Sequence, residues 1–320
     1  MANIDFPEYS LEEEGVPLCD PCVVIALFSE AVLGSGDSPD LSGPYNTFVK
    51  KFGSDVSFCR IGGNQMHAKP IRPDDLTAWP NWLADTKRRS RGGFNVELRS
   101  GRSRNEWRAP SLEADHSVIG APHSHYRISL PLTWFLENRL TGLLELLRSM
   151  LVGYPLSTGY VGYSFVWEKS SPHVSDVCGP HFRLWLQRHP GLLCPDSGSQ
   201  SEVARYGITD LGWLTLLGPK YVNQLGGIDE LRNLLQSVSN ISLLPIGRES
   251  VLVQIDNHPT LGDATTGDCL ENYSATGQVL SPIRNRQMLV DNLVVPGIRG
   301  SHFPEERARW IDRFFPTASN

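Results

Sequence analysis

The sequence predicts an α+β fold in which helices pack on mixed or antiparallel sheets, and two patterns support this prediction. Apolar and polar residues alternate over residues 94–99 and 126–130, which is typical of antiparallel strands with one buried face. Leucines recur at helical spacing over residues 133–151, and Pro155 lies just beyond the end of that pattern. The chain shows no tandem repeat of the kind that marks a solenoid or propeller.

Two apolar stretches punctuated by glycine are predicted to form the scaffold. In Pro155–Trp167, large apolar side chains share one face, whereas Gly162 and Ser164 leave the other face nearly bare, so another element can lie close to this strand. In Leu211–Gly227, an apolar run ends at Gly218 and a short amphipathic piece follows it. Neither stretch contains catalytic residue types, so we expect both to serve packing.

The first part of the chain contains short elements separated by Gly, Pro, Asp and Ser. We expect residues 1–18 to form an extended acidic arm. The elements expected after the arm are a strand at 23–28, a loop at 35–43, a helix ending near residue 51, a hairpin of strands at 56–61 and 66–71, and a helix from Pro73 with Leu76, Trp79 and Leu83 on its inner face.

The strands at 94–99 and 126–130 are expected to pair directly with each other. The intervening residues, Ser100–His125, are then a long loop that holds most of the exposed arginines and three histidines. The helix at 133–151 follows, with one apolar stripe formed by Leu136, Leu140, Leu143, Leu147 and Leu151.

The second half repeats the order of strand, helix, strand pair and helix. Its expected elements are a strand at 159–167, a helical region at 174–189, helices at 228–235 and 270–280, a hairpin of strands at 241–246 and 251–255, and a last helix from Pro304 that buries Trp310, Ile311 and Phe314. Two arrangements fit this order. Either residues 19–152 and 153–320 form two related α+β lobes behind the arm at 1–18, or residues 19–320 form one continuous domain.

Composition is that of an ordinary globular chain of 320 residues, with 40% hydrophobic and 20% charged residues. The N-terminus lacks a basic region followed by an apolar core, and no apolar run approaches the roughly 18 residues that span a bilayer, so we expect a cytoplasmic protein. Six cysteines are too sparse for a disulfide framework. Cys19 and Cys22 resemble a zinc or redox half-site, but no second pair accompanies them.

The net charge of −6 conceals an asymmetry between two segments. The first 49 residues contain no Lys or Arg, and their carboxylates are Asp5, Glu8, Glu12, Glu13, Glu14, Asp20, Glu30, Asp37 and Asp40. Between residues 87 and 108 the basic residues are Lys87, Arg88, Arg89, Arg91, Arg99, Arg102, Arg104 and Arg108, with only Glu97 and Glu106 of opposite sign. The acidic segment repels nucleic acid, whereas the basic segment attracts it.

Sequence motifs for common enzymes are missing. The chain has no phosphate-cradling G-x-x-x-x-G-K-[ST], no G-x-G-x-x-G, no H-E-x-x-H and no G-x-S-x-G. The cluster of His116, His123 and His125 beside Asp115 leaves a metal-dependent hydrolase as a weak hypothesis, although no distant ligand is specified and loop histidines are usually solvated.

Each charged segment can have a binding role or can simply be exposed to solvent. The arginine stretch at 87–108 contains only Trp107 as an interleaved aromatic, whereas nucleic-acid modules stack bases on several, so a loop that is solvated or meets a protein is favoured. The acidic segment is either a solubilising tail or a decoy whose carboxylates occupy a basic, nucleic-acid-binding cleft and speed association to about 10⁸ M⁻¹s⁻¹.

Four segments carry a resemblance to a known family: PLSTGYVGYSF at 155–165, GWLTLLGPKYVNQLGG at 212–227, GDATTGDCLENYSATGQVLSPI at 262–283 and HFPEERARWIDRFF at 302–315. They resemble, in the same order, the TsiV-like family of type VI secretion immunity proteins. The resemblance covers most of residues 20–315. It implies an antidote that binds a cognate toxin, commonly a nuclease of the restriction-endonuclease type, in the cell that makes it.

This resemblance supplies no catalytic motif, so we expect no enzyme activity, no cofactor and no metal. The first hypothesis is an immunity protein that covers the active or substrate-binding cleft of a secreted toxin, without nucleic acid or membrane as a partner. The alternative is a nucleic-acid-binding regulator that uses residues 87–108. The residues expected to contact the toxin are Glu12, Glu13, Glu14, Asp20, Asp37, Asp40, Arg102, Arg104, Trp107 and Arg108.

Overall fold

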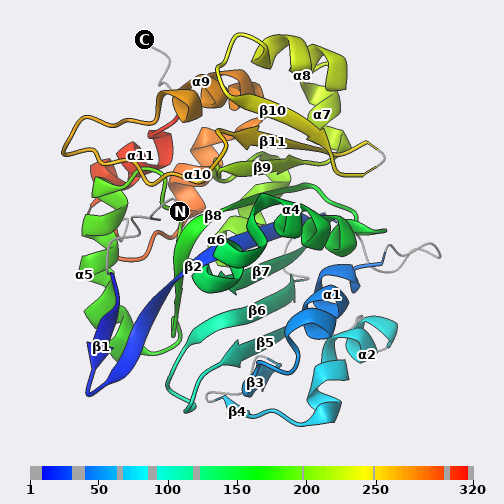
Figure 1. Ribbon diagram of the computed structural model, residues 1–320, viewed down its shortest axis with the longest axis vertical. Coiled ribbons are helices and arrows are strands. Elements are labelled where there is room, and N and C mark those ends of the chain that lie inside the picture. The colour runs from blue at the N-terminus through cyan, green and yellow to red at the C-terminus, as the bar shows by residue number, and fades with distance from the viewer. Residues whose placement is uncertain are drawn as a thin grey trace.

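One large antiparallel sheet organises the chain in the computed structural model, which describes residues 9–30, 40–62, 68–85, 92–117, 123–196, 198–247, 249–298 and 303–315. Ten of its eleven strands follow the order β10-β11-β9-β8-β2-β7-β6-β5-β3-β4, and β1 pairs with β2 (Figure 1). Helices pack around this sheet, so the predicted α+β class is confirmed.

The bounds of the elements are as follows. The strands are β1 Leu11–Glu13, β2 Val16–Ser29, β3 Phe58–Ile61, β4 Lys69–Pro70, β5 Phe94–Ser100, β6 Arg108–Ser117, β7 His123–Pro131, β8 Thr158–Trp167, β9 Leu214–Leu217, β10 Ile241–Pro245 and β11 Val251–Ile255. The α-helices are α1 Gly43–Phe52, α2 Ala78–Ala84, α4 Leu132–Leu151, α5 Pro172–Arg188, α6 Gly198–Val203, α7 Pro219–Gln224, α8 Ile228–Leu235, α9 Glu271–Leu280, α10 Arg286–Asn292 and α11 Pro304–Asp312, and the 3₁₀ turns are η1 Pro73–Thr77, η2 Ala204–Tyr206 and η3 Ser281–Ile283.

The long strand β2 lies in the middle of the sheet. It pairs with β7 along one edge and with β8 along the other, so that Cys22 lies opposite both Pro131 and Ser164. All ten residues of β8 are buried. A side chain at Gly162 would meet Leu193, only 2.8 Å from an ideal Cβ, which confirms that a bare strand face admits close packing here.

The strands β3, β5, β6 and β7 have one apolar and one charged face, because successive side chains of a strand point to opposite sides. The apolar face, with Leu98, Leu112 and Ile128, joins the main core, on which α1, α2 and α4 pack (Figure 1). On the other face Arg60 pairs in register with Glu97, Glu97 with Glu113, and Glu113 with Arg127. We call this side, defined by Arg60, Glu97, Arg99, Glu113 and Arg127, the charged face.

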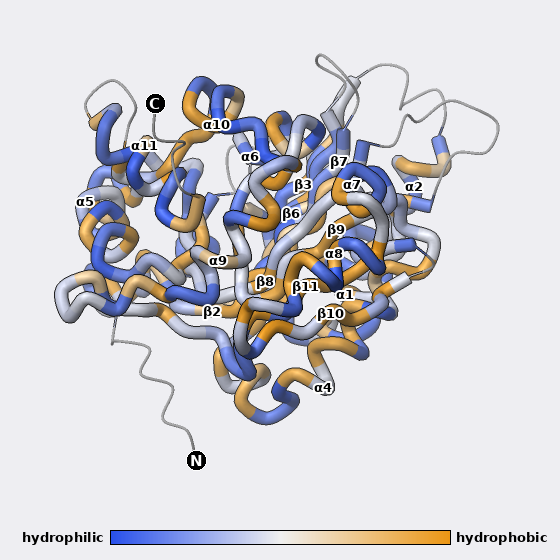
Figure 2. The backbone as a smooth tube through the Cα atoms, turned by 90° about the horizontal axis from the view of Figure 1, so that it is seen from above, coloured by the Kyte–Doolittle hydropathy of each residue, from blue (hydrophilic) through white to orange (hydrophobic). Residues whose placement is uncertain are grey.

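Hydrophobic segments concentrate at the strands of the interior, such as β8 and β11, and the surrounding helices alternate between polar and apolar residues (Figure 2). In the C-terminal part, α9 packs so closely on the end of the chain that a Cβ on Gly277 would lie 1.9 Å from the Phe314 carbonyl oxygen. None of the helices in the described part of the chain combines the length and apolarity needed to cross a bilayer.

Several predicted elements are confirmed, including α8, the β10–β11 hairpin, α9 and α11 with its buried Trp310 and Ile311. The long loop predicted at Ser100–His125 is wrong. Most of it is β6, which separates β5 from β7, so these two strands do not pair with each other. Glu113 and Asp115 of β6 lie on the charged face, and these polar residues make the strand look like a loop in the sequence.

The leucine stripe predicted for α4 is correct only in its second half. Arg139 has φ 52° and ψ −160°, which interrupts the helix and changes the direction of the side chains before it. Leu143 and Leu147 are fully buried, whereas Leu136 is 40% exposed and Phe135 is buried instead. A prediction from hydrophobic periodicity assumes an unbroken helix. It therefore assigns residues of the first turns, such as Leu136, to the buried side of α4 although they are exposed.

The acidic segment is not an extended arm where the structure describes it. Residues 11–18 belong to the β1–β2 hairpin, in which Glu13 pairs with Val16 across the Glu14-Gly15 turn. The division into lobes at 19–152 and 153–320 stays a prediction. The sheet itself is continuous, because β2 bonds to strands on both sides of residue 153.

Candidate functional site

The two charged segments meet at the end of the sheet where the β1–β2 hairpin lies. Glu14 and Gly15 both have positive φ, of 52° and 75°, which is the geometry of a two-residue hairpin turn. This turn leaves Glu12, Glu13 and Glu14 exposed. In Figure 1 the hairpin lies beside α5, and Glu13 forms an ion pair of 2.6 Å with His173 in the first turn of that helix.

Glu106 orders the arginine segment, and Arg108 of that segment lies close enough to the hairpin to feel the charges of Asp20 and Glu12. The Nε of Arg108 donates to Glu106 Oε1 at 2.5 Å, and the backbone N–H of Arg102 donates to the other carboxylate oxygen at 2.6 Å. The bond from Glu106 raises the pKa of Arg108, and the nearby charges of Asp20 and Glu12 add to this effect. Burial raises the pKa of Asp20, an effect that the positive charge of Arg108 opposes.

Glu168, directly after β8, is the centre of a second network beneath this surface. Its carboxylate accepts bonds from Arg99 at 2.9 Å, from Arg60 at 3.3 Å and from the Trp107 indole N–H at 2.5 Å. The Arg99 guanidinium also lies over the Trp107 ring, 4.3 Å from its centroid. Because Arg99 is 1% exposed, its charge depends on Glu168 for compensation.

Lys169 anchors the middle of the charged face. Its ammonium group donates to Glu113, and it also contacts Asp196 at 3.4 Å. These acids hold the pKa of Lys169 above its usual value although burial opposes them. Burial, and then the charge of Glu113, raises the pKa of Glu97 to about 7.

Two cavities open over these residues. A cleft of about 760 Å³ lies between the hairpin, the charged face and the start of α5, and its walls include Glu13, Glu14, Arg104, Glu168 and His173. A second cavity of about 290 Å³ shares Asn95 and Glu97 with it and extends over the charged face towards α6. The two form a grooved, mixed-charge surface that suits a charged macromolecule.

The structure brings most of the predicted contact residues to this surface. Those at the hairpin or beside it are Glu12, Glu13, Glu14, Asp20, Arg102, Arg104 and Arg108, of which Arg102 and Arg104 are exposed. Trp107 is 1% exposed, so its ring supports the surface from below. Asp40 lies apart, before α1, where its carboxylate accepts bonds from Ser42. Asp37 lies outside the described residues.

The alternative functions find less support. His116 lies on the apolar face, where its ring centroid is 5.5 Å from that of Trp82, whereas His123 and His125 lie on the charged face with Asp115, so the strand pairing removes His116 from the predicted histidine cluster. All three histidines are buried in strands and are not solvated loop residues. Within the described ranges, no group of three or more His, Cys, Asp and Glu residues is arranged to hold a metal ion.

Cys19 and Cys22 occupy opposite faces of β2, Cys19 in the main core and Cys22 beside Trp107, so they do not form a half-site. Residues 86–91, with four of the eight basic residues of the arginine segment, lie outside the described residues. In the described part of that segment, Arg99 and Arg108 already pair with carboxylates.

Comparisons with known proteins agree with the architecture. The family model described as type VI immunity for VRR-NUC matches residues 69–314. The chain belongs to this TsiV family. A solved structure of a Pseudomonas aeruginosa T6SS protein, PA0821, has the same fold, with a TM-score of 0.72 and 17% sequence identity over 95% of this chain and 83% of that one. No curated protein matches. A narrower likeness, to the immunity protein TsiT and its toxin TseT, is not confirmed by these matches.

Sequence patterns did not reveal the residues that hold the charged face together. These are Arg60, Glu97, Glu113, Glu168 and Lys169. Glu97 and Glu113 each belong to an alternation of ionisable and apolar residues within a strand, Arg60 stands alone in β3, and Glu168 and Lys169 directly follow β8. A pattern of this kind predicts a solvated face, and only the folded chain shows that the charges neutralise one another.

Proposed function

We propose that this TsiV-family chain binds a cognate type VI effector nuclease and neutralises it by covering its active or substrate-binding cleft. The family match over residues 69–314 is the observation that carries the proposal. The chain then acts by surface complementarity in the cytoplasm of the cell that makes the toxin, and it catalyses no reaction.

The surface formed by the β1–β2 turn, by Arg102 and Arg104, and by the adjoining cleft is the part of the molecule that best suits this role. We call it the hairpin surface. A nuclease cleft must attract phosphates and is therefore basic, and the exposed Glu12, Glu13 and Glu14 offer it carboxylates on a projecting turn. Arg102 and Arg104 lie beside them and supply the opposite charge for acidic groups, such as metal-binding carboxylates, inside such a cleft. A tight complex of this kind buries about 1,600 Å² in total, and we include the adjoining cleft in the proposed interface.

Association kinetics test the acidic part of this surface. We expect a Glu12→Lys, Glu13→Lys, Glu14→Lys variant to bind the toxin encoded beside it at least about tenfold more slowly and with a shallower salt dependence, because steering depends on these charges. A Glu145→Lys, Glu249→Lys, Glu305→Lys variant has the same change in net charge on exposed residues elsewhere and is the matched control. Equal association rates for the two variants would remove the hairpin from the mechanism.

Neutralising Arg102 and Arg104 tests the other half of the surface. If these arginines enter the interface, replacing both with Gln increases the dissociation rate and weakens protection of a cell that expresses the toxin. The measurement is growth with the toxin co-expressed, alongside surface plasmon resonance. Retention of DNA by the isolated chain at physiological salt in a gel shift, lost in the same variant, would instead support the nucleic-acid-binding alternative.

A further inference from the structure

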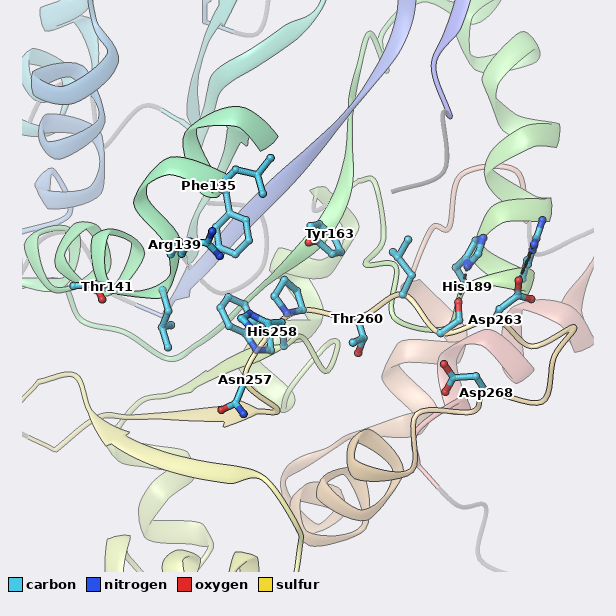
Figure 3. Close-up of a pocket in the computed structure, with 17 residues that line it drawn as sticks. Phe135, Arg139, Thr141, Tyr163, His189, Asn257, His258, Thr260, Asp263 and Asp268 are labelled. Atoms are coloured by element: carbon cyan, nitrogen blue, oxygen red, sulfur yellow. Dashed lines mark hydrogen bonds and ion pairs between the residues drawn. The ribbon is translucent and has the colours of Figure 1, made fainter. Parts of the chain in front are cut away.

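A third cleft lies between the start of α4, β8 and the segment 257–263 (Figure 3), and it shares no lining residue with the cleft beside the β1–β2 hairpin. Its volume is about 950 Å³, which is the size of a pocket for a peptide side chain and its neighbours. Four buried apolar side chains form its floor: Phe135, Tyr163, Trp213 and Leu261. The Phe135 ring meets Trp213 edge to face at 5.8 Å, so the floor is well packed.

One wall of this cleft is held rigidly. The Nδ1–H of His189 donates to the Gly262 carbonyl oxygen at 2.6 Å, so its Nε2 accepts the hydroxyl of Tyr9 at 2.8 Å. At the same end Arg188 and Asp263 form an ion pair of 2.7 Å. These hydrogen bonds and this ion pair hold the wall in place, so the cleft is formed without a ligand.

The opposite end is open to solvent. The side chains of Arg139, Asn257 and His258 line the cleft there, are exposed, and form no hydrogen bond or ion pair with another described residue (Figure 3). Arg139 presents an exposed guanidinium that has no ion pair with a described residue, and Leu136, another lining residue, is 40% exposed. An apolar floor next to a free guanidinium is complementary to an apolar side chain that adjoins a carboxylate.

The backbone of Arg139 adds an independent observation. Its φ of 52° and ψ of −160° are readily adopted only by glycine, yet an arginine occupies the position. Strained residues of this kind cluster at ligand-binding sites, where the side chain has a use that outweighs the strain.

We propose that this cleft binds a peptide segment of a protein partner, in which a bulky apolar side chain fills the floor and a neighbouring carboxylate pairs with Arg139. The proposal does not depend on the toxin-binding role of the hairpin, because the two surfaces are separate. It identifies the partner only by the chemistry of the segment.

The probes for this cleft are two matched peptides, N-acetyl-Trp-Asp-amide and N-acetyl-Trp-Lys-amide, titrated into the full chain and followed by NMR. We expect the Asp peptide to bind with a Kd below about 1 mM and at least about tenfold more tightly than the Lys peptide. Equal binding of the two peptides, or no binding of either, would overturn the proposal.

Two variants separate the binding role of Arg139 from a structural one. Arg139→Gly suits the backbone and should not lower the melting temperature, yet it should abolish the preference for the Asp peptide. Arg139→Lys keeps the charge and should keep the preference. A preference that survives Arg139→Gly contradicts the proposal. So does a large gain in peptide affinity when residues 1–8 are removed, since Phe6 beside Asp5 would then be the natural occupant.

Discussion

At the scale of single residues, Glu168 has the largest consequence for stability. Its carboxylate is the shared acceptor for Arg60, Arg99 and Trp107, and it is 12% exposed. Among the described residues, Arg99 forms an ion pair with Glu168, and Arg60 forms ion pairs with Glu168 and Glu97. The charges of both arginines therefore depend on Glu168. A buried cation that loses its counter-ion is strongly destabilising.

We therefore expect Glu168→Gln to lower the free energy of unfolding by about 3 kcal/mol. The amide keeps the shape and one acceptor oxygen of the carboxylate but removes its charge. Urea unfolding followed by tryptophan fluorescence measures the effect. Glu249→Gln, on an exposed residue that forms no hydrogen bond or ion pair with another described residue, is the control and should stay within about 0.5 kcal/mol of the parent chain. A loss no larger than that of the control would show that the network does not depend on this charge.

The raised pKa of Glu97 should make the stability of the fold depend on pH. Its pKa in the folded chain is about 7, above the ordinary value of 4.5, so the folded state holds this proton more tightly than the unfolded state does. Its contribution to stability is fully present below pH 4.5 and is lost as pH rises through 7. Glu97→Gln is neutral at every pH and should therefore gain stability relative to the parent chain across this window, by at most about 3 kcal/mol.

The measurement is urea unfolding of both chains at several values between pH 4.5 and 8. Glu249→Gln again serves as the control, since an exposed acid should give a stability difference that hardly changes over this range. A constant difference between Glu97→Gln and the parent chain would show that Glu97 is ionised throughout, with Arg60 as its partner at 3.2 Å.

At the scale of the elements, the β1–β2 turn places Glu14 in a left-handed conformation at φ 52°, next to Gly15 at φ 75°. Turns of this type favour Asn followed by Gly. We expect Glu14→Asn to raise the free energy of unfolding by about 0.5–1 kcal/mol, measured by urea unfolding. Glu13→Asn, one residue earlier in the strand, should give no gain, and a gain of equal size there would mean that removal of negative charge, not the turn, is responsible.

Sequence patterns predict an element well where one physical rule governs all of it. The β10–β11 hairpin and α8 lie where they were expected, because each keeps a single periodicity between clear breaks. The prediction fails where a second rule intervenes. In β6 the pairing of Glu113 with Lys169 permits charges in a buried strand, and in α4 the conformation of Arg139 resets the helical phase.

The candidate site is predictable only in part for the same reason. The exposed charges of Glu12–Glu14, Arg102 and Arg104 are visible in composition, and the structure places them together at one end of the sheet. That Asp40 lies elsewhere, and that Trp107 is covered, depends on how strands far apart in sequence align. No local pattern encodes the registers of β2 with β7, β7 with β6, and β6 with β5.

At the scale of the whole molecule, the continuous sheet leads us to expect that the chain unfolds as one cooperative unit. Because β2 bonds to β7 on one side and β8 on the other, cutting the chain near residue 153 leaves a fully buried strand with an open edge. We expect the isolated fragment 153–320 not to fold, as judged by near-ultraviolet circular dichroism. The intact chain should then give coincident unfolding curves by fluorescence and circular dichroism. A folded fragment would instead favour two lobes.

The central position of β2 also bears on timing. This strand is synthesised well before Thr158–Trp167, the strand that covers its second edge, and pairings between such distant segments are slow to form. A newly made copy is thus incomplete for a while after synthesis begins. A cell that makes an immunity protein of this kind together with its toxin benefits if synthesis of the immunity protein starts first and if folded immunity protein is kept in excess.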